Sequence, residues 1–167
     1  MLRRLIAPIL SFTAEEAWEA LYPGREESVF FHPWEGVLPA QDGEAALAVK
    51  WGRLREIRAL VQKSLEELRQ SGGIGSSLQA EVAIAAPEGD RALLESVGPD
   101  LRFVLITSTA TVEPGAALAV RVTASPHAKC ERCWHCREDT GADARHPAIC
   151  TRCVANIEGP GEERRHA

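Results

Sequence analysis

Apolar residues recur at intervals of three and four positions near the start of the chain, which predicts two short amphipathic helices. The first apolar stripe consists of Leu2, Leu5, Ile6, Ile9 and Leu10. Thr13 is typical of an N-cap, and Glu16 is placed to complete a capping box. We expect the second helix to point Trp18 and Leu21 inward and to end at the Pro-Gly pair of residues 23–24.

The segment that follows should be extended, because a proline within residues 29–34 is incompatible with a helix interior. Aromatic side chains are concentrated in this part of the chain. We interpret Trp18, Trp34, Phe30 and Phe31 as packing residues rather than as platforms on which bases stack.

A longer helical pattern covers residues 43–71 and ends at the glycines of positions 72–73. Its apolar seam consists of Leu47, Trp51, Leu54, Ile57, Leu60, Val61, Leu65 and Leu68. Arg58 interrupts this seam. On the other face, basic residues such as Arg53 and Arg69 alternate with glutamates. That face is either a ridge for phosphates or an ordinary solvated surface with local ion pairs, and we favour the second interpretation.

From residue 77 the pattern changes to a period of two, which indicates strands. Residues 78–84, 101–107, 109–112 and 118–123 are predicted strands, and residues 88–97 are a predicted short helix. Together with the long helix, these elements predict a small α+β module in which the helix lies on one face of a short sheet.

Composition and charge exclude several function classes. The chain has 167 residues, enough for one ordinary domain or for two small modules and a metal knuckle. Its net charge of −5 argues against binding nucleic acid through bulk electrostatics. Glycines within residues 72–77 resemble a phosphate loop, but the lysine of such a loop is missing and a strand follows. We find no serine–histidine–acid order, no spaced catalytic carboxylates and no internal repeat.

The first ten residues combine two arginines with an apolar run and so resemble a signal peptide. Pro8 interrupts this run, acidic residues follow it, and no convincing cleavage site is present. No stretch approaches the roughly 20 apolar residues that cross a bilayer. We therefore expect a cytoplasmic protein without membrane contact.

Four cysteines form the strongest chemical signal in the sequence. Cys130 and Cys133 make one Cys-x-x-Cys knuckle, Cys150 and Cys153 make a second, and sixteen residues separate the two. Two such pairs supply the four thiolates of a tetrahedral structural zinc site, and four protein ligands leave no position for water or substrate. Two disulfides or an iron–sulfur cluster are the alternatives. The fifth cysteine, Cys136, is either a bystander or a substitute ligand.

Residues 127–167 contain no apolar run that could form a core, so we expect folding of this segment to depend on the metal and to weaken in acid. Trp134 and His135 directly follow the second cysteine, while Arg132 and Arg152 occupy matching positions in the two knuckles. These side chains could contact an RNA backbone and an unstacked base, or they could cover the metal site by ordinary packing. The sequence leaves both interpretations open.

Three motifs carry a resemblance to a known family. Residues 5–18 resemble the last part of the helical anticodon-binding domain of class I aminoacyl-tRNA synthetases. Residues 74–80 are similar to the motif that follows the long helix in bacterial isoleucyl-tRNA synthetases, and residues 129–135 with 150–153 resemble the zinc knuckle of that family. The motifs occur in the family's order. Cys136 departs from it, because an aromatic or other residue commonly occupies that position.

The resemblance implies an α+β chain in three parts. Residues 1–40 would be the end of a helical anticodon-binding domain, 41–126 an α+β junction module, and 127–167 a four-cysteine zinc knuckle. Zinc would be structural, and Cys130, Cys133, Cys150 and Cys153 would be its ligands. Arg132, Trp134 and His135 are the candidate contacts to transfer RNA.

The resemblance also implies a function. The family's His-Ile-Gly-His and Lys-Met-Ser-Lys-Ser motifs, which serve ATP and adenylate chemistry, are missing here, so we expect this chain to be inactive alone. We expect a monomer that holds the anticodon arm of isoleucine tRNA and works with the remainder of a synthetase. The alternative function is a free-standing zinc-ribbon protein, which would bind protein partners through residues 2–10, or a nucleic-acid interaction module. An enzyme with a metal-activated thiol is disfavoured, because the four-sulfur site is closed.

Overall fold

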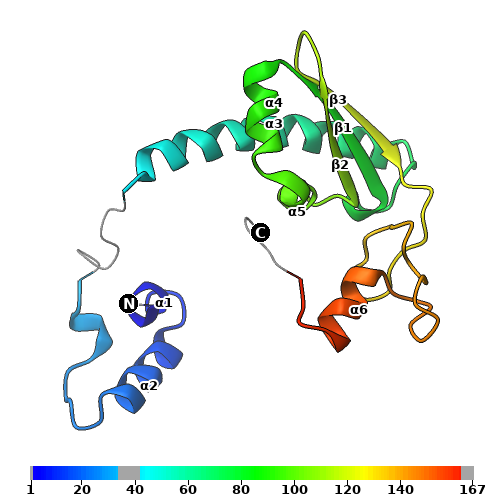
Figure 1. Ribbon diagram of the computed structural model, residues 1–167. Coiled ribbons are helices and arrows are strands. Elements are labelled where there is room, and N and C mark those ends of the chain that lie inside the picture. The colour runs from blue at the N-terminus through cyan, green and yellow to red at the C-terminus, as the bar shows by residue number, and fades with distance from the viewer. Residues whose placement is uncertain (1, 34–41, 163–167) are drawn as a thin grey trace. The chain divides into compact units, whose positions relative to one another are not determined.

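The computed structural model describes residues 2–33 and 42–162. The chain forms two compact units, residues 1–47 and 48–167. The smaller unit is helical, and the larger one contains a sheet with helices and the cysteine-rich segment (Figure 1). The mixed α+β class predicted from the sequence is confirmed.

The smaller unit is built around the indole ring of Trp18. Helices α1 (Leu2–Ile6) and α2 (Ser11–Leu21) and a 3₁₀ turn, η1 (Val29–Phe31), surround it. Its buried residues are Ala7, Ala14, Trp18 and Val29. The Trp18 Nε1–H group donates to the carbonyl of Glu27 at 2.8 Å, and its ring lies 4.6 Å from that of Tyr22. The predicted packing role of Trp18 is confirmed.

Helix α2 starts earlier than predicted, so the N-cap assigned to Thr13 is wrong. The amide of Ala14 already donates to the carbonyl of Leu10 at 2.8 Å, which places Thr13 inside the helix. The buried face is therefore set by Ala14 and Trp18, four residues apart. Leu21, which was expected to point inward, is 58% exposed at the last position of the helix.

The extended conformation predicted from residue 29 is also wrong. Ser28 accepts a hydrogen bond from the amide of Phe30 at 3.2 Å and starts the η1 turn. The carboxylate of Glu15 accepts from the Ser28 hydroxyl and from the Val29 amide, at 2.9 and 3.0 Å. Phe30 is 52% exposed and does not have the packing role expected of it.

Phe31, predicted to pack in the same way, is 73% exposed. Trp34, the remaining aromatic residue in this prediction, lies outside the described residues.

The long helix α3 (Glu44–Gln70) agrees with its prediction to within one residue at each end. Its seam is buried at Leu54, Ile57, Val61 and Leu65, whereas Leu47 and Leu60 are about half exposed. Gly72, at φ +80°, ends the helix, and the Gly73 amide donates back to the carbonyl of Leu68 at 3.0 Å. The predicted glycine stop is confirmed.

Ion pairs occupy the polar face of α3, as expected of a solvated surface. Arg69 bonds Glu66, and Arg53 bonds both Glu56 and Asp90. Asp90 belongs to α4 (Glu88–Glu95), so Arg53 ties this helix to α3. In the part of the chain that the structure describes, no helix combines the length and apolarity that crossing a bilayer requires.

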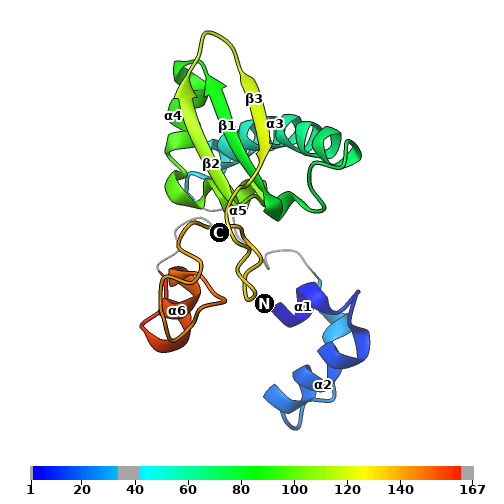
Figure 2. The ribbon, with the colours of Figure 1, turned by 90° about the vertical axis from the view of Figure 1, so that its right-hand side faces the viewer.

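Three strands form one mixed sheet in the order β2-β1-β3. Strand β1 (Ala80–Ala86) follows the turn η2 (Ser77–Gln79) and pairs in parallel with β2 (Thr109–Pro114) and antiparallel with β3 (Ala119–Ala124). Ile84 lies opposite Val112 on one side and Val120 on the other. Figure 2 looks onto the sheet, with α3 and α4 behind it.

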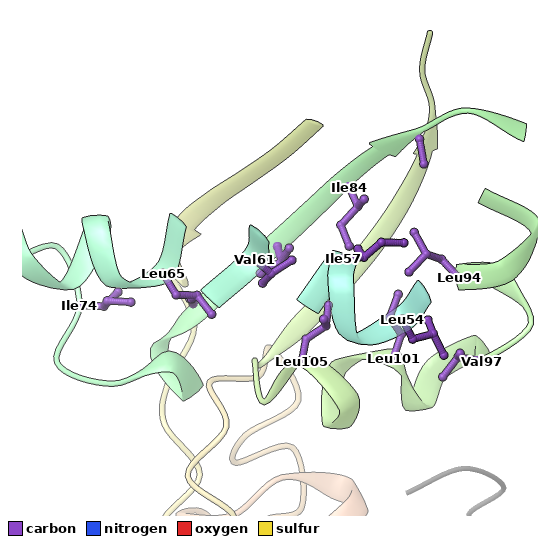
Figure 3. Close-up of a cluster of buried hydrophobic side chains, with 13 residues drawn as sticks. Leu54, Ile57, Val61, Leu65, Ile74, Ile84, Leu94, Val97, Leu101 and Leu105 are labelled. Carbon is purple, nitrogen blue, oxygen red and sulfur yellow. The ribbon is translucent and has the colours of Figure 1, made fainter. Parts of the chain in front are cut away.

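The main core lies between α3 and the sheet. Burial alternates along β1, and Val82 and Ile84 point to the helical side. Figure 3 shows Ile57 and Val61 of α3 and Leu94 of α4 gathered around Ile84. The predicted arrangement of the long helix on one face of a short sheet is confirmed.

Residues 101–107 do not form the predicted strand. After a 3₁₀ turn, η3 (Gly98–Asp100), they begin the short helix α5 (Leu101–Leu105). Leu101 and Leu105 are both 2% exposed and lie one helical turn apart. Two parallel neighbours need a crossover connection, and α4 with α5 supplies it between β1 and β2. Ile106, at φ 59°, ends α5.

Candidate metal centre

Four cysteine side chains meet in the C-terminal segment. The sulfur atoms of Cys130, Cys133, Cys150 and Cys153 all lie within 4.8 Å of one another. The Cys130–Cys153 pair is 3.7 Å apart and the Cys133–Cys150 pair 3.8 Å. Sulfurs about 2.3 Å from a zinc ion, at the corners of a tetrahedron, lie about 3.8 Å apart. The donor set and its spacing therefore fit a structural zinc ion.

Each knuckle has its own backbone support. In the first, the Trp134 amide donates to the carbonyl of Cys130 at 2.8 Å, and the Cys130 amide donates to that of His135 at 2.9 Å. The second knuckle begins helix α6 (Thr151–Glu158), with Cys150 as the N-cap residue. The Cys150 amide lies 3.4 Å from the sulfur of Cys130 and donates to it. The fold thus aims amide hydrogens at the sulfurs.

The pKa values of Cys130, Cys150 and Cys153 are shifted in different directions. Burial opposes ionisation of Cys130, but backbone N–H groups, among them those of Cys133 and Cys150, lower its pKa to about 6. Burial raises the pKa of Cys150 to about 12 and also raises the pKa of Cys153. A divalent cation among the sulfurs would favour the thiolate form of all four.

Two arginines compensate the charge of the sulfur cluster. Arg132, from the first knuckle, hydrogen-bonds the sulfur of Cys153 in the second. Arg152, from the second knuckle, hydrogen-bonds the sulfur of Cys133 in the first. Four thiolates around one Zn²⁺ would carry a net charge of −2, and these two guanidinium groups would offset part of it, because Arg152 is also paired with Glu162.

Cys136 is not one of the four clustered cysteines. Its side chain is 6% exposed, and burial raises the pKa of its thiol. Its amide donates to the hydroxyl of Ser108 at 2.6 Å, which attaches this segment to the module with the sheet. This contact favours the bystander interpretation of Cys136.

The three candidate RNA contacts have different surroundings. Arg132 is exposed and Trp134 is 59% exposed, with Lys129 Nζ 5.1 Å from the centre of a Trp134 ring. His135 is 8% exposed, and its imidazole meets the ring of Phe103 edge-on at 5.7 Å. The structure therefore presents Trp134 and Arg132 to solvent and buries His135.

Several residues around the centre escaped prediction from the sequence. Phe103 contacts the guanidinium of Arg152 at 5.0 Å as well as His135. Phe103 lies within the segment that was expected to be a strand, residues 101–107, and Ser108 directly follows it. Their contacts join positions about 28 to 49 residues apart, and no local spacing in the sequence indicates them.

Family comparisons agree with the two parts of this architecture. Residues 1–84 match a family described as the anticodon-binding domain of tRNA ligase. Residues 129–156 match a family described as a zinc finger found in FPG and IleRS, and this segment contains all four clustered cysteines. The four-cysteine cluster is thus a structural zinc site in a recognised zinc-finger segment.

Curated relatives match almost the whole chain. The isoleucine–tRNA ligase of Bordetella petrii is 55% identical over 172 residues, that of Nitrosomonas europaea 53% over 171, and that of Chromobacterium violaceum 51% over 165. Each match covers 98% of this chain but 18% of the relative. The chain therefore belongs to the tRNA-ligase anticodon-binding family, and it corresponds to the segment of isoleucine–tRNA ligases that joins the end of this domain to the zinc finger.

Proposed function

We propose that this chain is a tRNA-binding region of an isoleucine–tRNA ligase and that it holds the anticodon arm of isoleucine tRNA. Cys130, Cys133, Cys150 and Cys153 are the zinc ligands in this proposal. The ion supplies shape, because four thiolates leave no open position for chemistry. Attachment of isoleucine, which consumes ATP, would take place elsewhere in the ligase, and this region would contribute by positioning the RNA.

The predicted division into residues 1–40, 41–126 and 127–167 is part of this proposal. It assigns the helical unit to the end of the anticodon-binding domain and the finger to RNA contact. The family matches support the assignment of the two end parts.

The observation that carries the proposal is the conformation of Trp134. Its backbone has φ 66°, in the left-handed region that glycine adopts readily and that costs a bulky residue about 1–2 kcal/mol. The residue is nevertheless 59% exposed, so burial does little to offset this cost, although the indole Nε1–H donates to the carbonyl of Glu131 at 3.1 Å. A strained, exposed aromatic residue with Lys129 Nζ 5.1 Å from its ring, two positions after the exposed Arg132, is suited to stacking on an unpaired base.

His135 has a different role in this proposal. Its ring is enclosed by Phe103, and its Nδ1 atom lies 3.1 Å from the carbonyl of Cys133. A contact between this ring and RNA would require it to leave that environment. We therefore assign His135 to positioning the first knuckle, next to the exposed ring of Trp134.

Trp134→Gly tests the function, because it removes the ring while relieving the backbone strain. We expect zinc content and unfolding midpoint to stay close to those of the unchanged chain. Affinity for an anticodon stem-loop of isoleucine tRNA, titrated at fixed salt, should fall about 5- to 150-fold, the range for one base–aromatic stack. Ile157→Ala, at a half-exposed apolar position of the same finger, should bind like the unchanged chain.

Equal affinity of the unchanged chain and Trp134→Gly would return Trp134 to a packing role. Absence of stem-loop binding by the unchanged chain would contradict the proposed function itself. Affinity for a polypeptide without affinity for the stem-loop would favour the zinc-ribbon interaction protein.

A further inference from the structure

Three arginines come together where the finger meets α5. Arg102 lies in α5, Arg137 follows the first knuckle, and Arg152 lies in α6. The guanidinium carbons of Arg102 and Arg152 lie 4.8 and 5.0 Å from the centre of the Phe103 ring. All three arginines are partly buried. This arginine cluster is made by two segments that only the folded chain brings together.

Two of the three guanidinium groups have carboxylate partners. Arg137 bonds Asp139 at 2.8 and 3.1 Å, and Arg152 bonds Glu162 at 3.0 and 3.2 Å. The Nε atom of Arg102, in contrast, is buried and has no hydrogen-bond partner among the described residues. A buried donor without an acceptor costs roughly 1–3 kcal/mol, and more when it is charged.

The charges around Arg102 favour an added anion. Burial, and then the charges of Arg137 and Arg152, lower the pKa of Arg102, while Glu162 and Asp100 act in the opposite direction. The oxygens of Glu162 are already engaged by Arg152. A partly buried cation next to two others is stabilised by an anion more strongly than an exposed arginine would be, because solvent screens it less.

We infer that Arg102 binds a backbone phosphate of the tRNA whose unpaired base stacks on Trp134. This inference rests on the proposed function and adds a second contact to it. A guanidinium group presents a planar fork of donors that matches phosphate oxygens. The guanidinium of Arg102 lies over the ring of Phe103, and Phe103 meets the ring of His135. His135 directly follows Trp134 in the chain. The stacking ring and the phosphate site are thus linked through the neighbouring side chains of Phe103 and His135, of which His135 is buried.

The location also fits the charge of the chain. A net charge of −5 provides no general attraction for RNA, so a phosphate contact must come from a local group of cations. Arg102 is suited to this because its side chain is already held against Phe103, which reduces the entropy lost when it binds.

The test compares Arg102→Gln with Arg121→Gln, which removes the same charge from an arginine of β3 whose side chain is 69% exposed. Stem-loop affinity is titrated at several salt concentrations for both variants and the unchanged chain. Loss of one phosphate contact should reduce the slope of log affinity against log salt by about 0.7 to 0.9. We expect this reduction, and a lower affinity, for Arg102→Gln, and neither for Arg121→Gln.

Stem-loops with a single uncharged linkage identify which phosphate Arg102 contacts. They can be tested on the unchanged chain, so this measurement does not depend on the folding of a variant. In these RNAs a single phosphate is replaced by a methylphosphonate, one position at a time. One replacement should weaken binding by the unchanged chain and leave binding by Arg102→Gln unchanged. If Arg102→Gln loses its zinc, Arg102→Lys takes its place, and the sensitive position should then lose part of its effect.

Two outcomes would overturn the inference. The first is a folded Arg102→Gln variant with the salt slope of the unchanged chain. The second is that every methylphosphonate replacement weakens binding by the unchanged chain and by Arg102→Gln by the same factor. If either is found while Trp134→Gly still weakens binding, the proposed function stands and the phosphate site does not.

Discussion

The guanidinium of Arg152 lies 5.0 Å from the centre of the Phe103 ring and connects the second cysteine knuckle to helix α5. The same guanidinium bonds Glu162 and the sulfur of Cys133. Phe103 also takes the edge of His135 from the first knuckle. Both knuckles therefore meet on one aromatic ring, and this ring attaches the finger to α5.

Phe103→Leu should weaken this attachment while retaining an apolar side chain of similar size. Each cation–π contact at a partly exposed site contributes about 0.5–1 kcal/mol, and the edge contact to His135 a similar amount. We expect a loss of about 1–3 kcal/mol in unfolding free energy by urea titration, with faster amide exchange in α6. Phe12→Leu, at a position that is 87% exposed, should change stability by less than about 0.5 kcal/mol.

Ser108→Ala should weaken the attachment of the finger to the module with the sheet by removing a hydrogen bond instead of a ring contact. The Ser108 hydroxyl accepts from the Cys136 amide at 2.6 Å and donates to the carbonyl of Leu78 at 2.5 Å, and Ser108 is 1% exposed. Its removal leaves the buried Cys136 amide without an acceptor, at about 1–3 kcal/mol, and the partly buried Leu78 carbonyl without a donor, at a smaller cost. Urea unfolding measures the loss, and Ser96→Ala, at an exposed helix end, is the matched control.

An unchanged unfolding midpoint in Ser108→Ala would mean that water takes over both hydrogen bonds. The hydroxyl would then be dispensable for attaching Cys136 to the module.

Elements whose buried positions repeat with a local period could be predicted from the sequence. Elements whose conformation depends on contacts with distant residues could not. The seam of α3 and the alternation in β1 were predictable, because each residue's environment follows from its spacing to near neighbours. Residues 101–107 have strand-like composition, yet the first five of them form α5, because the parallel pairing of β1 and β2 requires a crossover. Leu101 and Leu105 have helical spacing, but a segment with only these two positions is too short to reveal a helical period.

The metal centre shows the same division. Its cysteines were predictable, because two-residue spacing within a knuckle is a local requirement of metal binding. The ring of Phe103 was not predictable, because it comes from a helix far away in the sequence. The burial of His135 depends on that ring, and so sequence alone gave His135 the same exposure as Trp134.

Asp90→Asn tests the connection between α3 and α4. The hydrogen bonds from Arg53 hold the pKa of Asp90 below its ordinary value. A carboxyl group with a lowered folded-state pKa stabilises the fold above its unfolded pKa of about 4, and this contribution disappears as pH falls through the folded value. At pH 7 we expect a loss of about 1 kcal/mol or less, because Arg53 is 42% exposed and solvent screens the pair.

The difference between Asp90→Asn and the unchanged chain should shrink below pH 4, as measured by urea unfolding at a series of pH values. Glu56→Gln removes the other carboxylate that bonds Arg53 and keeps the bridge to α4, so it is the matched control. A difference that stays constant down to pH 2 would show that the charge of Asp90 contributes nothing.

Removing the metal should unfold the finger and leave the sheet intact. Among the described residues, the buried cluster of the finger consists of cysteines with Ile149 packed against them, whereas the main core has its own apolar residues from α3 and β1. Zinc binding supplies about 10–16 kcal/mol of folding free energy in zinc-finger peptides, far more than the burial of one isoleucine side chain supplies. A chelator at neutral pH should therefore abolish amide protection in α6 and preserve it in β1, as followed by hydrogen exchange. Cys133→Ala should reproduce this loss and Cys136→Ala should retain the zinc, whereas protection of α6 in metal-free protein would show that the finger folds without its ion.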